Sequence, residues 1–298
     1  MTSIVRQAHA KVNVFLRVLG RRGDGYHDIE TLVLPISLHD VITVRPAADL
    51  TVEVSGPTAP GVPDGDANLA LRAARALAAA AGGPASERGA RISIEKRIPV
   101  AAGLGGGSAD AAATLRALDE LWRLGAGEDV LRRVALDVGS DVPALLLGEP
   151  AYVRGRGEIV EPVLVQTTSW VVRPFGGVSA AEAYAWWDEQ PATGPDPGAL
   201  IAAAEAGNDA LLGSALFNDL QGPVAARRDE VADAVAALLD AGAHGAVMSG
   251  SGPTVAALCP FASAPDVAAA VERAIVADAP APPTAPARIG PTDPSGVV

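Results

Sequence analysis

The sequence lacks most of the features that mark a secreted, a membrane-spanning or a nucleic-acid-binding protein. Its one cysteine, Cys259, excludes an intrachain disulfide and with it a secreted disulfide scaffold. No stretch reaches about 18 strongly apolar residues, so the sequence predicts no membrane span. Lys and Arg number 23 against 35 Asp and Glu, which gives a net charge of −12. Surfaces that bind nucleic acid are usually net basic, so we expect neither a nucleic-acid nor a membrane partner.

The amino-terminal segment shows no targeting signal, because Lys11, Asn13 and Arg17 interrupt any continuous apolar run. We therefore expect a cytoplasmic protein. Hydrophobic residues make up 49% of the 298 residues, enough for a sizeable core without covalent staples.

Expected strands and helices alternate irregularly in both halves, which predicts an α+β fold rather than a fully parallel sheet. We expect an N-terminal domain over residues 1–160 and a C-terminal domain over 161–278, meeting near residues 155–165. Proline is frequent from Asp278 onward, which indicates a disordered tail over 279–298.

The clearest local pattern lies in residues 10–18, where apolar and polar residues alternate with period two. This predicts a strand with Lys11 and Asn13 projecting from the same face. The other expected strands cover residues 29–36, 41–44, 50–54, 91–95, 170–173, 246–248 and 254–258. The expected helices cover residues 68–81, 129–137, 181–187, 224–241 and 267–277, and one that Ser108 caps and Gly125 ends.

Four glycines stand within residues 103–107, directly before an expected helix. Glycine backbones can turn their N–H groups inward, and the start of a helix favours an anion, so this loop predicts a phosphate site. A Walker loop is excluded because the chain has no Gly-Lys pair. A dinucleotide fingerprint started at Gly103 meets Ser108 in place of its last glycine, so a Rossmann dehydrogenase is excluded too.

The run over residues 99–112, Pro-Val-Ala-Ala-Gly-Leu-Gly-Gly-Gly-Ser-Ala-Asp-Ala-Ala, resembles the signature of the GHMP small-molecule kinases. Within that superfamily it resembles the kinases of 4-diphosphocytidyl-2-C-methyl-D-erythritol. Six further segments are similar in the same order along the chain: residues 10–13, 24–27, 66–69, 139–143, 217–220 and 248–252. The resemblance covers roughly residues 5–277.

The resemblance implies a two-domain GHMP kinase fold with its active-site cleft between the domains, the C-terminal one ferredoxin-like. It implies transfer of phosphate from ATP, with Mg²⁺, to the 2-hydroxyl of the cytidylyl substrate in the non-mevalonate isoprenoid pathway. Lys11 and Asp141 would be catalytic. The ATP-binding residues would be Asn68, Leu69, Pro99, Val100, Ala101, Ala102, Gly103, Leu104, Gly105, Gly106, Gly107, Ser108 and Ala109. The substrate-binding residues would be Asn13, Tyr26, His27 and Tyr184. We expect a monomer or a homodimer.

The residue types fit this chemistry. An alcohol kinase needs a proton acceptor for the hydroxyl, and Asp141 lies in a turn where a carboxylate can face a cleft, although an aspartate there can also simply cap a helix. Lys11 can keep that carboxylate ionised and stabilise the transferring phosphoryl group. Tyr26 can stack on a base and His27 can hydrogen-bond its edge.

Other charged and ligating residues suggest no further site. Lys96 lies in a charged run, Glu95-Lys96-Arg97, and we expect it to be solvated or to flank the nucleotide. His9, His39 and His244 have no metal partners at ligand spacing, so no protein metal site is expected. Ala109 and Ala180 stand where the family commonly carries hydroxyl residues.

Two alternatives stay open from the sequence. One is another kinase of the superfamily, such as a homoserine kinase, which the motif Gly25-Tyr26-His27 disfavours. The other is a nucleotide-binding regulator without turnover, which the presence of both Lys11 and Asp141 disfavours.

Overall fold

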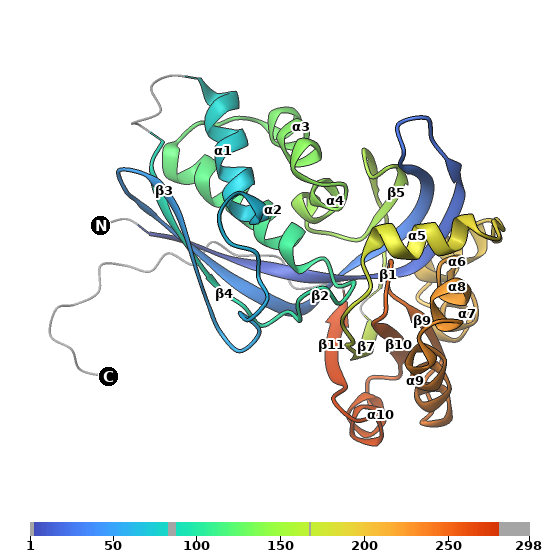
Figure 1. The fold of residues 1–298 in the computed structure, drawn as a ribbon. Helices are drawn as coiled ribbons and strands as arrows, with labels where there is room; N and C mark the ends of the chain where they lie inside the picture. Colours follow the sequence, from blue (N-terminus) through green and yellow to red (C-terminus); the bar gives the residue numbers. More distant parts are fainter. Residues whose placement is uncertain (1–2, 83–87, 167, 280–298) are drawn as a thin grey trace, which may run out of the picture.

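The computed structural model describes residues 3–82, 88–166 and 168–279. These residues form two mostly antiparallel sheets, each covered by helices. Each sheet with its helices makes one layer, and the two layers meet near the middle of the long strand β1 (Figure 1). The cleft that carries the candidate site lies where they meet. The mixed α+β fold expected from the sequence is confirmed.

The N-terminal layer is built on a seven-stranded sheet with strand order β3-β4-β2-β1-β8, to which β5 and β6 add as a hairpin on β2. Its strands are β1 (Ile4–Arg21), β2 (His27–Pro46), β3 (Leu50–Ser55), β4 (Ala90–Glu95), β5 (Ala151–Gly155), β6 (Ile159–Pro162) and β8 (Phe217–Asn218). Its helices are η1 (Gly65–Ala67), α1 (Leu69–Ala81), α2 (Gly106–Trp122), α3 (Glu128–Val138) and α4 (Val142–Leu147).

Helices α1 to α4 gather on one face of this sheet (Figure 1). Their apolar sides pack on one core cluster that includes Leu77, Leu115 and Val134 from the helices and Ile42 and Ile92 from the strands. Small alanine side chains dominate the inner side of α2, so this helix lies close to α1 and to the sheet. That packing fixes the first turn of α2, which carries the glycine loop.

The C-terminal layer is a four-stranded sheet of order β11-β7-β10-β9. Its strands are β7 (Thr168–Arg173), β9 (Gly245–Met248), β10 (Val255–Cys259) and β11 (Ile275–Ala279). Its helices are α5 (Ala180–Asp188), α6 (Gly198–Glu205), α7 (Asp209–Ser214), α8 (Gln221–Ala225), α9 (Asp229–Asp240) and α10 (Ala264–Ala270). Strand, helices, two strands, helix and strand in this order are typical of a ferredoxin-like arrangement.

The two layers are joined through shared structure. The short strand β8 from the second half pairs in parallel with β1 at Phe15 and Leu16. One core cluster contains Val12 and Leu34 of the first sheet together with Trp170 and Leu258 of the second. The domain boundary near residue 160 therefore stays a prediction, because strand pairing and core packing both cross it.

Three element predictions were wrong. Residues 29–36 and 41–44 belong to one continuous strand, β2, because β1 pairs with it from Ile4 to Arg21. The helix expected over 224–241 is two helices separated at residues 226–228. The helix expected over 267–277 ends at Ala270, and Ile275–Ala279 pairs with β7 instead.

The sequence also predicted a disordered C-terminal tail and the lack of a membrane span. Of the disordered tail expected over 279–298, Ala279 lies in β11, and residues 280–298 lie outside the described residues. In the portion of the chain that the structure describes, none of the helices combines the length and apolar character of a membrane span.

Candidate active site

Two cavities share the glycine loop as a common wall. The first, here called the loop pocket, has a volume of about 280 Å³ and is lined chiefly by residues 99–108 with Asn68, Leu69, Lys96 and Asp110. The second, here called the cleft pocket, has a volume of about 630 Å³ and lies between the two layers. Gly103, Gly105 and Ser108 line both cavities. The two pockets therefore adjoin at this loop.

The loop backbone needs its glycines. Gly103 has a φ of 74°, and a Cβ there would stand 2.7 Å from the Ser249 carbonyl oxygen and 2.9 Å from that of Gly252. Gly105 has a φ of 69° and is the N-cap of α2. The helix therefore starts at Gly106. Ser108, which the sequence predicted as the N-cap, lies in the first turn of the helix instead. Unpaired N–H groups at this helix start favour a phosphate.

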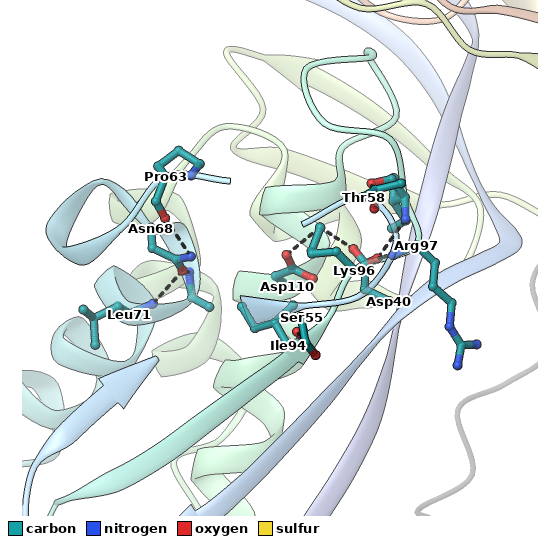
Figure 2. A network of polar contacts seen from close by, with 12 residues as sticks. Asp40, Ser55, Thr58, Pro63, Asn68, Leu71, Ile94, Lys96, Arg97 and Asp110 are labelled. Carbon is teal, nitrogen blue, oxygen red and sulfur yellow. Dashed lines mark hydrogen bonds and ion pairs between the residues drawn. The ribbon is translucent and has the colours of Figure 1, made fainter. Parts of the chain in front are cut away.

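Asn68 lines the loop pocket, and both polar atoms of its side chain already form hydrogen bonds within the protein. Its side-chain oxygen caps helix α1 by accepting the N–H groups of Ala70 and Leu71 at 3.0 and 3.3 Å, and its amide donates to the Pro63 carbonyl at 3.2 Å (Figure 2). Leu69 also lines this pocket. Ala109, the remaining expected ATP-binding residue, does not line it; its side chain is buried on another side of α2.

A buried network of ion pairs connects the segments on either side of the glycine loop. Lys96 donates to Asp40 and, at 2.8 Å, to Asp110 (Figure 2). Asp40 also accepts the backbone N–H groups of Arg97 and Ile98, which lead into the loop, whereas Asp110 lies in α2 after it. The network thus ties both ends of the glycine loop together.

Lys96 was expected to be solvated or to flank the nucleotide. It is not solvated, since the residue is 3% exposed, but it lines the loop pocket. Its partners lie 56 and 14 residues away in sequence, beyond the reach of a local charge pattern. Burial raises the pKa of Asp110 to about 8, against the opposing effect of Lys96. One cation buried with two carboxylates is easiest to accommodate when one carboxyl is protonated.

Lys11 and Asn13 meet in the cleft pocket, as the alternation of their strand predicted. The Lys11 ammonium donates to the Asn13 side-chain oxygen and, at 2.9 Å, to the Gly103 carbonyl. Asn13 in turn donates to the Thr31 hydroxyl at 2.8 Å. Burial lowers the pKa of Lys11, while the nearby Asp141 acts to raise it. These contacts aim one buried cation at the loop.

Asp141 faces this cation. Its carboxylate lies 3.9 Å from the Lys11 ammonium, and its side chain is 55% exposed toward the cleft pocket. Asp141 stands at the N-cap position of α4, yet its side chain makes no capping hydrogen bond. The alternative that this aspartate only caps a helix is therefore not supported, and the carboxylate is available to accept a proton.

Of the expected substrate-binding residues, Asn13 lies beside Lys11, and Tyr26, His27 and Tyr184 give the cleft pocket its aromatic walls. His27 stacks on Tyr184 with ring centroids 4.7 Å apart, and its Nε2 donates to Asp188 at 2.8 Å. Tyr26 is 50% exposed. Burial raises the pKa of the Tyr184 hydroxyl, which keeps it a hydrogen-bond donor. Ala180 lines the same cavity. Aromatic faces and oriented polar groups of this kind suit a nucleobase.

Sequence reasoning missed the residues that hold the second glycine loop against the first. The Ser249 hydroxyl accepts the Asn13 N–H at 3.1 Å and donates to the Gly103 carbonyl at 3.2 Å. The Asn218 amide donates to the carbonyls of Met248 and Gly250 at 2.6 and 2.8 Å. The segments 217–220 and 248–252 carried a signal, since both took part in the family resemblance, but no contact could be assigned.

Comparison with known proteins agrees with this geometry. Residues 68–149 match the model of the GHMP kinases N terminal domain, and residues 200–277 match that of the GHMP kinases C terminal domain. A 4-diphosphocytidyl-2-C-methyl-D-erythritol kinase of Symbiobacterium thermophilum is 44% identical over 258 residues, covering 85% of this chain and 90% of the relative. The chain belongs to the 4-diphosphocytidyl-2-C-methyl-D-erythritol kinases, a branch of the GHMP kinases. The resemblance seen in the sequence is confirmed.

Solved structures support this branch. A 4-(cytidine 5'-diphospho)-2C-methyl-D-erythritol kinase superposes with a TM-score of 0.74 at 35% identity, covering 92% of this chain and 98% of that one. A homoserine kinase from Cytophaga hutchinsonii superposes almost as well, with a TM-score of 0.73, but at 20% identity over 94% and 95% of the two chains. That second likeness shows the shared GHMP kinase fold alone.

Proposed function

We propose that this chain transfers the γ-phosphoryl group of ATP to the 2-hydroxyl of 4-diphosphocytidyl-2-C-methyl-D-erythritol, a step of the non-mevalonate isoprenoid pathway. The observation that carries the proposal is the shared wall of the two pockets. ATP held in the loop pocket presents its phosphates to the start of α2, and an alcohol in the cleft pocket lies beside Asp141 and Lys11.

The side chains account for each part of the transfer. The Asp141 carboxylate accepts the proton of the attacking hydroxyl. The hydroxyl oxygen forms a bond to the γ-phosphorus while the bond between that phosphorus and the bridging oxygen breaks, and ADP leaves with the electron pair. Lys11, held by Asn13 and Gly103, stabilises the negative charge on the transferring group.

Magnesium is proposed to enter with ATP. No cluster of three or more His, Cys, Asp or Glu side chains suited to a metal occurs within residues 3–82, 88–166 and 168–279. The nucleotide phosphates would therefore supply most of the ligands, and the Ser108 hydroxyl, which lines both pockets, is the oxygen of the loop best placed to add one. The ion would neutralise phosphate charge during transfer.

The cytidylyl end of the substrate is assigned to the aromatic walls of the cleft pocket, with Tyr26 stacking on the base and His27 and Tyr184 beside it. We propose that the enzyme acts as a monomer or a homodimer. Both substrates are charged, water-soluble molecules, and we assign the reaction to the cytoplasm.

The test is an ADP-release assay with the purified full chain and MgATP. We expect ADP to appear in proportion to added 4-diphosphocytidyl-2-C-methyl-D-erythritol and not with homoserine. Turnover of homoserine would favour the homoserine kinase alternative. ATP binding without ADP release on any of these alcohols would favour the non-catalytic regulator.

A further inference from the structure

Arg156 lines the cleft pocket without an acidic partner. Its guanidinium lies 5.1 Å from the centre of the Tyr26 ring, and within the described residues it forms neither an ion pair nor a side-chain hydrogen bond. The other cations that line this pocket are engaged. Lys11 faces Asp141, and Arg21 lies 3.5 Å from Asp188. The pocket thus contains one positive charge that no carboxylate balances.

The fold places this arginine firmly beside the reacting groups. Arg156 stands between Gly155 and Gly157 in the turn of the β5–β6 hairpin, and both glycines have positive φ angles of 72° and 122°. A Cβ at Gly157 would stand 2.3 Å from the Ser140 carbonyl oxygen, so the turn packs directly on the residue before Asp141. The turn that carries Arg156 thus contacts the segment of Asp141, while the Arg156 guanidinium lies against Tyr26 in the same pocket.

The nearest acid along the chain is occupied elsewhere. Glu158 accepts the backbone N–H of Arg156 at 2.6 Å and lies 3.8 Å from the Arg22 guanidinium. The Glu158 carboxylate thus binds the backbone of the turn and the Arg22 side chain, and it forms no ion pair with the Arg156 guanidinium. A guanidinium that is weakly hydrated, planar and unpaired is well suited to bind a phosphate through two parallel N–H donors.

We propose that Arg156 binds the diphosphate of the cytidylyl substrate and thereby distinguishes cytidine diphosphates from cytidine. This proposal rests on the proposed function, because it assumes a substrate whose base lies at Tyr26 and whose reacting alcohol lies at Asp141. The diphosphate joins those two ends. In a chain with a net charge of −12, a local cation without a carboxylate partner reduces the repulsion of a dianion.

Calorimetric binding of CDP and of cytidine to the full chain, without ATP, tests the proposal. In the parent chain CDP should bind more tightly than cytidine. Arg156→Met should weaken CDP binding about 10–100-fold, as expected for loss of a charged hydrogen-bond donor, and leave cytidine binding unchanged. Arg156→Lys should restore part of the loss. Arg154→Met is the matched control, because Arg154 pairs with Glu161 at 2.6 Å and does not line the cleft pocket.

Each other result overturns the proposal. An equal loss for CDP and cytidine would place Arg156 on the base instead of the diphosphate. Unchanged CDP binding in Arg156→Met, in a chain that still turns over the cytidylyl substrate, would remove the arginine from recognition and leave the proposed function intact. A parent chain that binds neither CDP nor cytidine and shows no turnover would refute the proposed function together with this inference.

Discussion

Replacement of Asp141 by asparagine isolates its role as proton acceptor, because the substitution keeps the shape of the side chain and removes its basicity. The carboxylate is 55% exposed and caps no helix, so the variant should fold like the parent. Loss of a general base lowers a rate by roughly 10²–10⁴. That corresponds to about 3–5 kcal/mol of activation free energy. We therefore expect kcat to fall by two to four orders of magnitude.

The affinity for ATP should change little in this variant. Asp141 does not line the loop pocket, and its interaction with Lys11 spans 3.9 Å at a partly exposed site. Steady-state kinetics with the cytidylyl substrate, combined with calorimetric binding of ATP, separate the two effects. Asp137→Asn serves as control, because Asp137 is an exposed aspartate on α3 that lines neither pocket. An Asp141→Asn enzyme with more than about a tenth of the parental kcat would refute the general-base role.

Three further outcomes are expected. Gly103→Ala should weaken ATP binding at least tenfold, whereas Gly125→Ala, which shares a positive φ but has open space around it, should not; equal ATP affinities would contradict the loop assignment. Tyr26→Ala should raise the KM for the cytidylyl substrate by one to two orders of magnitude, since stacking on an aromatic ring is worth roughly 1–3 kcal/mol per base, with the KM for ATP unchanged. The pKa of Asp110 is raised to about 8 in the folded chain, so the folded state holds a proton that the unfolded chain has already released. The stability that this proton contributes is lost as the pH rises toward and through that value. Urea unfolding of Asp110→Asn should therefore show a smaller fall in stability from about pH 6 to 9 than the parent chain; parallel curves would show that Asp110 does not titrate there.

Local sequence patterns predicted the parts of the site that one element or one loop builds. The alternation around Lys11 and Asn13 placed both side chains on one face, and they are hydrogen-bonded to each other. The glycine cluster predicted a loop before a helix, and Gly103 and Gly105 adopt the positive φ angles that favour glycine. In both cases the information lies within a few residues.

Contacts between distant segments were not predictable in this way. The charged run around Lys96 suggested a solvated or nucleotide-flanking side chain and gave no sign of the buried ion pairs with Asp40 and Asp110. Arg156 gave no signal, because its proposed role depends on contacts with Tyr26 and, through Gly157, with Ser140 from other parts of the fold. A single-sequence pattern carries no record of such partners.

Helix predictions failed where tertiary contacts overrode an alanine-rich pattern. The helix expected over 224–241 breaks near Arg228, whose guanidinium donates to the carbonyls of Gly176 and Gly177 and holds the chain in a turn. The expected last helix gives way to β11, because residues 275–279 complete the edge of the second sheet against β7. Alanine favours a helix in both segments, 224–241 and 267–277, and gives no indication of where the helices end.

The position of the new phosphate is the most direct test of the proposed reaction. After incubation of the full chain with MgATP and 4-diphosphocytidyl-2-C-methyl-D-erythritol, the product can be isolated and its phosphorus and carbon NMR spectra recorded. We predict one added phosphomonoester, coupled to carbon 2 of the methylerythritol unit, and formation of one ADP per product. A phosphate on another hydroxyl, or ADP formed without a phosphorylated cytidylyl product, would contradict the assignment of the cleft pocket and of Asp141 as the base for the 2-hydroxyl.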